Sequence, residues 1–183
     1  MRIALPGCVA QLPLNQLSHS YNKLVQRWTQ NPPTSNRREL DNQPHPEKLM
    51  RLDAMYKVGN IIKVAVQNKT SGTITVSALC DQVNGNHSRE SLRDGTILQA
   101  AIASVEDYGY GIELAIDGLP TAFVSANKFS GVMYVGQVFL VRVKRNHGGR
   151  LKFVPYQFEE VVNGKDWNLN SISPGQWKFS FMS

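Results

Sequence analysis

Three aromatic and four basic residues in the C-terminal half of the chain have side chains suited to holding single-stranded nucleic acid. They are Tyr108, Tyr110, Phe123, Arg142, Lys144, Arg150 and Lys152. Aromatic rings stack on bases and Lys or Arg contacts phosphates, and each stacked base contributes about 1 to 3 kcal/mol. Each residue also has an ordinary structural role open to it. Phe123 lies in an apolar strand, where core packing is favoured, and Arg142 and Lys144 fall on the outward face of a strand, where solvated charge is common.

The sequence offers little for catalysis or metal binding. No metal-ligand spacing relates the four histidines, His19, His45, His87 and His147. There is no phosphate-binding Gly-Lys-Ser/Thr loop and no nucleophile elbow. The carboxylates Glu106, Asp107, Glu113 and Asp117 bracket a strand and are interpreted as solubilising turn residues. We therefore expect no enzyme activity, no catalytic residue, no metal, no cofactor and no small-molecule substrate.

Composition favours a folded chain with anionic partners. The 183 residues are 42% hydrophobic, which is enough for a core, and the net charge of +6 gives a modest positive field. Cys8 and Cys80 lie too far apart in sequence to suggest a zinc motif or a disulfide framework, so a reducing compartment is expected. No apolar run approaches the length of a membrane span, and no secretion signal is recognisable.

The chain contains an internal repeat with a spacing of 77 residues. Val58-Gly59 aligns with Val135-Gly136, and the apolar residues Ile62, Val64 and Val66 align with Phe139, Val141 and Val143. Both copies alternate apolar and polar residues with period two, then pass through a polar, glycine-bearing turn into another strand. This pattern predicts a β-hairpin with one buried face in each copy.

Three more strands are predicted before the second hairpin, over residues 96–105, 110–116 and 119–124. The connections between them are short and contain Gly109 or Gly118. Five short strands, with a brief non-strand passage at residues 125–131 before the fourth, are typical of a closed five-stranded barrel. Residues 91–160 are therefore predicted to form one complete barrel.

The flanking regions are predicted to be incomplete repeats. Residues 3–14 resemble the end of a second strand and a third strand, with Gly7 in the role of Gly118. We therefore predict a partial barrel over residues 1–85, with a helical and loop insertion at about 17–56. Residues 171–175 parallel residues 91–95, so residues 161–183 are predicted to be a linker and the first strand of a third repeat.

The insertion is predicted to contain two short helices and a loop. Apolar residues recur at helical spacing at Leu17, Tyr21, Leu24 and Trp28. Residues 31–46 are rich in Pro, Asn and charge and should form a loop, and residues 47–56 should form a second helix. The first helix could dock a partner helix, but packing on its own barrel is the favoured interpretation.

Residues 91–154 resemble the S1 domain. The resemblance rests on Gly95 before the first strand, Glu106-Asp107-Tyr108-Gly109 at the first turn, Val135-Gly136-Gln137 before the fourth strand and Gly149-Arg150 before the fifth. Further motifs are 104–110, Asp117-Gly118 with Ala122-Phe123, and 166–171 with Pro174-Gly175. In these motifs the chain is similar to the N-terminal repeats of a family of large eukaryotic pre-ribosomal-RNA processing factors, the programmed cell death protein 11 family.

The resemblance implies an all-β fold of tandem five-stranded OB-type barrels (S1 domains), with short helices between strands 3 and 4. It implies a nuclear, nucleolar protein that binds precursor ribosomal RNA and other pre-ribosome assembly factors, with no membrane. Tyr108 occupies the usual place of the first stacking aromatic. Gly111 and Ser125 replace a second aromatic and a histidine, which keeps open an alternative role as a protein-docking spacer with little RNA contact.

Overall fold

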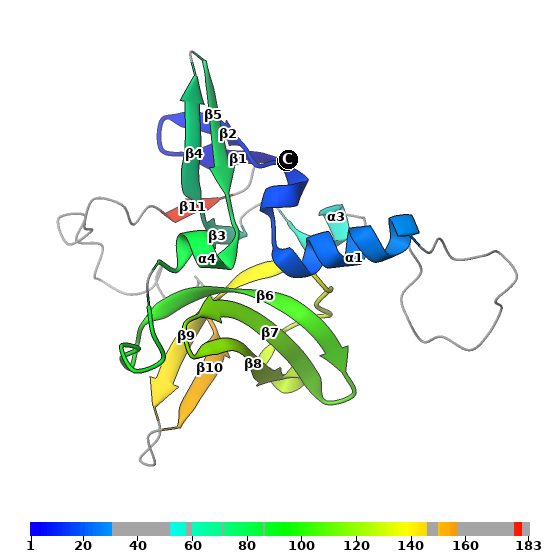
Figure 1. Ribbon diagram of the computed structural model, residues 1–183, viewed down its shortest axis with the longest axis vertical. Coiled ribbons are helices and arrows are strands. Elements are labelled where there is room, and N and C mark those ends of the chain that lie inside the picture. Colours follow the sequence, from blue (N-terminus) through cyan, green and yellow to red (C-terminus); the bar gives the residue numbers. More distant parts are fainter. Residues whose placement is uncertain are drawn as a thin grey trace, which may run out of the picture.

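The computed structural model describes residues 1–30, 52–57, 60–70, 72–85, 87–145, 150–156 and 178–180. These residues form a mostly β structure with few helices (Figure 1). Within the described ranges, no helix combines the length and apolar character needed to cross a membrane. The predicted loop at 31–46 and the predicted linker at 161–177 lie outside the described residues.

A curled five-stranded sheet forms the C-terminal half of the structure. Its strands are β6 (Ile97–Glu106), β7 (Gly109–Ile116), β8 (Leu119–Ser125), β9 (Val138–Arg145) and β10 (Leu151–Pro155). They are antiparallel in the order β10-β9-β6-β7-β8, and β8 curls round to contact β10. If the five strands are numbered in chain order, their spatial order across the sheet is 5-4-1-2-3. This order is consistent with an OB-type barrel.

Strands β6, β7 and β8 begin and end within one residue of the predicted ranges 96–105, 110–116 and 119–124. Along β7 the side chains of Tyr110, Ile112, Leu114 and Ile116 are all buried, while the residues between them are half-buried. This is the period-two pattern from which the strand was predicted. The short 3-10 helix η2 (Ala126–Lys128) falls in the predicted passage between the third and fourth strands.

The N-terminal half contains a four-stranded sheet and several helices. The sheet order is β1 (Arg2–Leu5), β2 (Cys8–Gln11), β5 (Thr73–Ser77) and β4 (Ala65–Thr70), with β2 and β5 parallel. β3 (Ile61–Lys63) pairs with β11 (Lys178–Ser180). The helical segments are η1 (Leu14–Gln16), α1 (His19–Gln30), α3 (Leu52–Met55) and α4 (Cys80–Val83).

The first helix packs against the five-stranded sheet, which is the other predicted barrel, and not only on its own N-terminal barrel as its sequence pattern favoured. Ser18 caps α1, since its hydroxyl accepts a hydrogen bond from the Tyr21 N–H at 3.1 Å and donates to the Gly136 carbonyl at 2.8 Å. Glu113 of β7 accepts from the N–H and the hydroxyl of Ser20, at 3.1 and 2.5 Å. A carboxylate at a helix N-terminus is favourable because it faces the positive end of the helix dipole.

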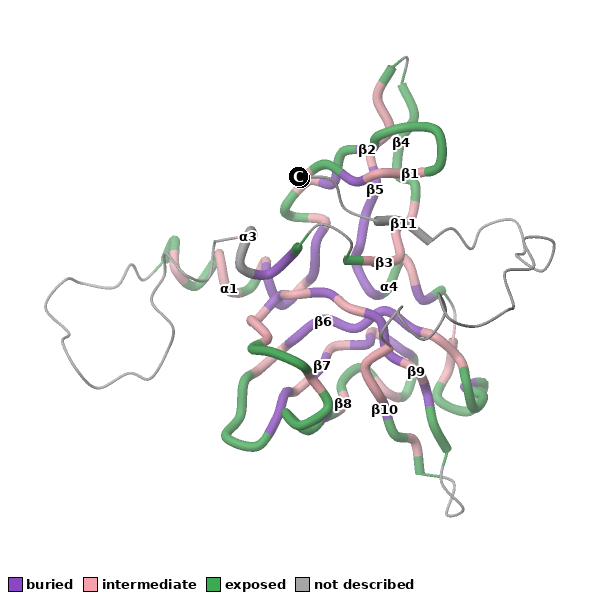
Figure 2. The backbone as a smooth tube through the Cα atoms, turned by 180° about the vertical axis from the view of Figure 1, so that it is seen from behind, coloured by how far each residue is buried: buried purple, intermediate pink, exposed green. Residues whose placement is uncertain are grey.

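Gly136 permits this close contact between α1 and the sheet. A Cβ atom at residue 136 would lie 2.6 Å from the Tyr21 Cβ atom, and the backbone φ of 86° also favours glycine. Leu17 and Tyr21 are consequently buried in a core shared by both halves of the structure, which also contains Ile3, Ile62, Ala101 and Val138. The second core lies inside the five-stranded sheet (Figure 2).

A buried polar network joins the two halves. The Asn84 side-chain amide donates to the carbonyls of Gln99 and Leu114, both at 2.8 Å, and accepts from the Gln99 N–H at 2.8 Å. The fully buried Gln99 side chain in turn accepts from the Lys63 N–H at 2.8 Å and donates to the Ala78 carbonyl. Five hydrogen bonds thereby join five residues from four segments and satisfy their buried polar groups.

The two cysteines are expected to differ sharply in reactivity. Cys8 is exposed, whereas Cys80 is fully buried and its thiol lies 3.7 Å from the Glu113 carbonyl oxygen. Burial raises the pKa of the Cys80 thiol, and the nearby carboxylates of Glu113 and Asp81 raise it further. Because the thiolate is the reactive form, a thiol reagent at pH 8 should label one cysteine of the native protein quickly and the second only after denaturation. A Cys8→Ser variant that is still labelled rapidly would contradict this expectation.

Candidate nucleic-acid interface

Two exposed aromatic rings meet at one end of the five-stranded sheet. Tyr108, in the turn between β6 and β7, is 73% exposed, and Phe123, on β8, is 42% exposed. Their ring centroids are 5.2 Å apart with an angle of 46° between the planes. The expectation that Phe123 packs in the core is therefore wrong. It lies on the outer face because it pairs with Gly111 of β7, while its neighbour Val124 pairs with the buried Tyr110.

Gly109 provides the space in which the Phe123 ring lies. A Cβ atom at residue 109 would stand 2.4 Å from the Phe123 Cζ atom and 2.5 Å from the Val124 carbonyl oxygen. Any side chain there would push the ring away from its place beside Tyr108. The glycine that follows Tyr108 in sequence thus helps to hold the aromatic pair, a role that its turn position alone did not indicate.

Tyr110 is not part of this exposed pair. Its side chain is 8% exposed, and its ring packs edge-on against Phe129, with the ring centroids 5.0 Å apart. The Tyr110 hydroxyl accepts a hydrogen bond from the Met133 N–H at 3.4 Å. The ring lies in the core of the five-stranded sheet, so it has no open face for a base, and Tyr110 has a packing role.

The four basic candidates lie on the β9–β10 hairpin. Lys144 and Lys152 are exposed and directly opposite each other in the strand register, and Arg150 is exposed just before β10. Like charges placed opposite each other repel, so an anion bound between them would relieve an unfavourable contact. Arg142 is half-buried, and its guanidinium lies 4.8 Å from the centroid of the Tyr156 ring.

Arg145, which no feature of the sequence marked as a candidate, has a structural role in the same hairpin. Its guanidinium donates two hydrogen bonds to the Leu92 carbonyl, at 2.7 and 3.1 Å. The backbone N–H of Arg145 donates to the Asp94 carboxylate at 2.8 Å. These bonds fix the hairpin to the segment before β6. Arg145 is therefore engaged with the protein rather than presented to a ligand.

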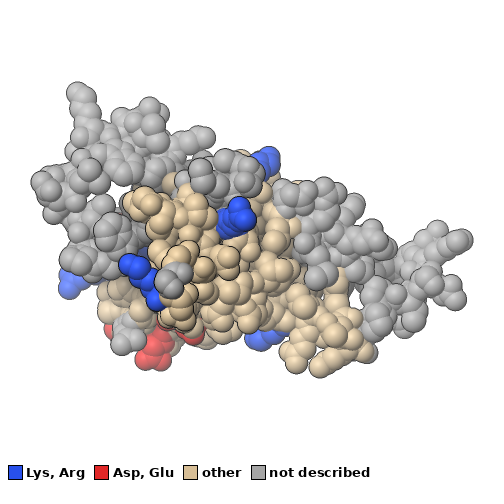
Figure 3. Space-filling view, turned by 90° about the horizontal axis from the view of Figure 1, so that it is seen from above, with Lys and Arg blue, Asp and Glu red and all other residues tan. Residues whose placement is uncertain are grey.

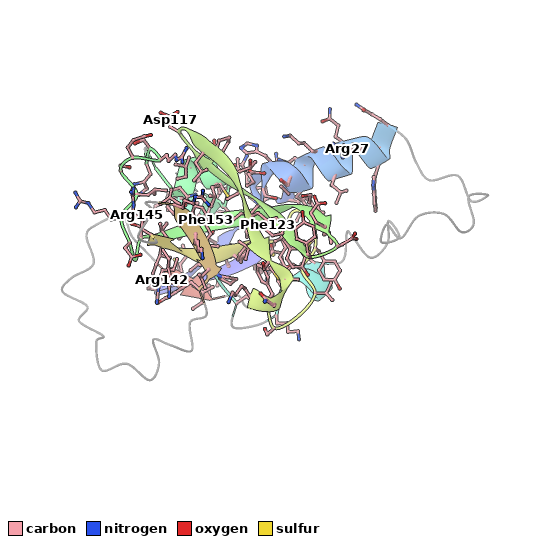
Figure 4. The ribbon with its side chains drawn as sticks, turned by 90° about the horizontal axis from the view of Figure 1, so that it is seen from below. Arg27, Asp117, Phe123, Arg142, Arg145 and Phe153 are labelled. Atoms are coloured by element: carbon pink, nitrogen blue, oxygen red, sulfur yellow. The ribbon has the colours of Figure 1, made fainter. Side chains whose placement is uncertain are left out.

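The aromatic pair and the basic hairpin lie at different ends of the sheet. Arg142 is paired with Ile97, at the start of β6, whereas Tyr108 follows the end of that strand at Glu106. Ten strand residues span up to roughly 30 Å, and Figure 4 shows Phe123 on one side of Phe153 with Arg142 and Arg145 on the other. Seen from above, Lys and Arg are also scattered rather than gathered in one patch (Figure 3).

The turn that carries Tyr108 is acidic. Glu106 and Asp107 are exposed beside it, and Glu106 accepts a hydrogen bond from the Ser104 hydroxyl at 2.8 Å. Carboxylates repel phosphates, so this end of the sheet is suited to bases and the hairpin end to the backbone of a nucleic acid. Among the described residues, no cluster of three or more His, Cys, Asp or Glu side chains could hold a metal ion.

A separate groove lies where the two halves of the structure meet. Its volume is about 590 Å³, and its walls include Tyr56, Ile61, Phe129, Leu140 and Tyr156. None of the seven candidate residues lines it. The groove and the candidate residues are therefore distinct features of the described surface.

Comparison with known proteins identifies three relatives. The chain is 27% identical to the mouse protein RRP5 homolog over an alignment 150 residues long, which covers 70% of this chain and 8% of the relative. It is 28% identical to the rRNA biogenesis protein RRP5 of Drosophila melanogaster over an alignment 135 residues long, which covers 68% of this chain and 9% of the relative. It is 24% identical to the human protein RRP5 homolog over an alignment 146 residues long, which covers 69% of this chain and 8% of the relative.

The chain spans less than a tenth of the length of these relatives. No family model matches it, and no solved structure matches it. The three relatives agree with the resemblance that the motifs around Tyr108, Asp117-Gly118 and Pro174-Gly175 indicate. By sequence, the chain is a relative of a short segment of the RRP5-type ribosomal-RNA processing factors, as its motifs predict.

Proposed function

We propose that this chain is an RNA-binding part of a ribosome biogenesis factor and that it holds single-stranded precursor ribosomal RNA without catalysing a reaction. The observation that carries the proposal is the exposed pair of Tyr108 and Phe123 on a sheet with OB-type strand order. Two open rings at one end of such a sheet form a platform for stacked bases. The RRP5 relatives supply the class of RNA, since one of them is named an rRNA biogenesis protein.

In this proposal the repeats act in tandem. Residues 1–85 and 91–160 form two successive S1-type barrels. A nucleolar location and contacts with other pre-ribosome assembly factors follow from the same proposal. The RNA strand would pass from the aromatic pair toward Lys144 and Lys152, with its bases at the first site and its phosphates at the second.

The proposal is tested by titrating the full chain into labelled single-stranded pre-ribosomal RNA at 50 and 200 mM salt. Binding should weaken with salt, because each contacted phosphate releases counterions. Lys144→Gln with Lys152→Gln should reduce the slope of log Kd against log salt by about 1 to 2, because about 0.7 is expected per single-strand phosphate. As a matched control, Lys23→Gln with Lys69→Gln removes two exposed lysines outside the hairpin and should leave the slope unchanged.

A second candidate function is a protein-docking spacer within a pre-ribosomal complex. It is favoured by the burial of Tyr110 and by the acidic residues that flank Tyr108, because both reduce the surface that is suited to RNA. A folded chain that binds no single-stranded RNA at 50 mM salt would select this alternative.

A further inference from the structure

The N-terminal strands leave a gap that a distant segment of the chain fills. The four-stranded sheet has β1 at one edge and β4 at the other, and β3 precedes β4 with only Val64 between them. β11 pairs antiparallel with β3, with Lys178 opposite Lys63, residue 179 opposite Ile62 and residue 180 opposite Ile61. β11 also lies in contact with β1.

Together these contacts close a ring of strands. From β4 the ring passes through β5, β2 and β1 to β11, and from β11 through β3 back into β4. Figure 1 shows β11, in red, beside β3 at the base of the N-terminal sheet. Without β11, one side of β3 and one side of β1 would be open edges, with backbone groups left to find other partners.

β11 occupies the place that β6 has in the five-stranded sheet. There, β6 lies between β7 and β9. The repeat aligns β3 and β4 with β9, and the hairpin β1–β2 corresponds to β7–β8, with Gly7 and Gly118 both at positive φ in the two turns. A strand between β1 and β3 is thus the first strand of a barrel. Residues 178–180 supply this strand, and the sequence just before them, residues 171–175, parallels residues 91–95 before β6.

We propose that the gap between β1 and β3 is a strand-acceptor site, and that residues 178–180 of the same chain fill it and close the N-terminal sheet into a barrel. The partner that fits the site is an extended segment with the sequence of a repeat's first strand. The 22 residues between Pro155 and Lys178 could span up to roughly 70 Å. The connection is therefore long enough for closure within one chain.

A disulfide in the full chain tests the pairing directly. Ile61→Cys with Ser180→Cys, in a Cys8→Ser background, places two thiols on opposed residues of an antiparallel pair. Opposed Cα atoms in such a pair are about 4.5 to 5.5 Å apart, within the range a disulfide bridges. The control is Val66→Cys with Ser180→Cys, because Val66 is exposed on β4 and pairs with Val76 instead.

Mild oxidation should give a crosslink within one chain, formed at least about ten times faster in the 61/180 variant than in the 66/180 control. Equal rates, or crosslinks only between two chains, would overturn closure in cis.

In a second measurement, a chain ending at residue 177 should lose hydrogen-exchange protection at β3 by about ten-fold or more, with β9 unchanged. Adding a peptide of residues 171–183 should restore it; failure of the peptide to restore protection would count against a strand-acceptor site.

Discussion

Replacing Tyr108 with alanine is expected to weaken the binding of single-stranded RNA by about 5- to 150-fold, which corresponds to about 1 to 3 kcal/mol for one stacked base. The ring is 73% exposed and makes its aromatic contact with Phe123, so its removal should change RNA affinity far more than stability. Fluorescence anisotropy with labelled RNA, at one fixed salt concentration, measures the loss.

Two further variants sharpen this test. Tyr108→Phe keeps the ring and should retain most of the affinity. Val132→Ala removes an equally exposed apolar side chain, 74% exposed, that lines the separate groove. Phe123→Ala should also weaken RNA binding. Because the two rings are in contact, the loss of binding free energy in the double variant should differ from the sum of the two single losses. Tyr108→Ala that binds RNA as tightly as Val132→Ala would contradict the aromatic platform.

Replacing Asn84 with alanine is expected to lower the free energy of unfolding by about 3 kcal/mol or more. The 4%-exposed side chain makes three hydrogen bonds, to the Gln99 carbonyl, the Gln99 N–H and the Leu114 carbonyl. Each buried group left without a partner costs about 1 to 3 kcal/mol. Urea denaturation followed by far-ultraviolet circular dichroism measures the change.

The matched control for this prediction is Asn22→Ala. Asn22 makes one side-chain hydrogen bond, to the Asn15 carbonyl at 2.8 Å, in an exposed setting. Its loss should cost less than about 1 kcal/mol, because water can replace the partner. Equal effects of the two variants would show that the network around Gln99 does not hold the two halves together.

Much of the strand pattern could be predicted from the alternation of apolar and polar residues. The strands β6, β7 and β8 and the helix α1 lie where the sequence places them, and the turn at Gly7 joins β1 to β2 as its likeness to Gly118 indicates. Period two and period 3.6 are local properties, so they can be recognised without knowing what packs against each element.

The assignment of faces could not be predicted in the same way. Alternation shows that Tyr110 and Ile112 share a face, but which face is inside depends on the partner strand. The pairing of Phe123 with Gly111 puts Phe123 outside and Tyr110 inside, and only the register reveals it. The roles of Asn84 and Gln99 were equally hidden, because their partners lie 15 or more residues away.

The most direct test of RNA binding at the Tyr108–Phe123 pair is photo-crosslinking of the full chain to 4-thiouridine-labelled single-stranded pre-ribosomal RNA, with the crosslinked peptides mapped by mass spectrometry. Stacking of bases on this pair predicts crosslinks at residues 108 and 123, with none at the buried Tyr110. Crosslinks that map elsewhere in the chain and spare both residues, from RNA bound at 50 mM salt, would contradict it.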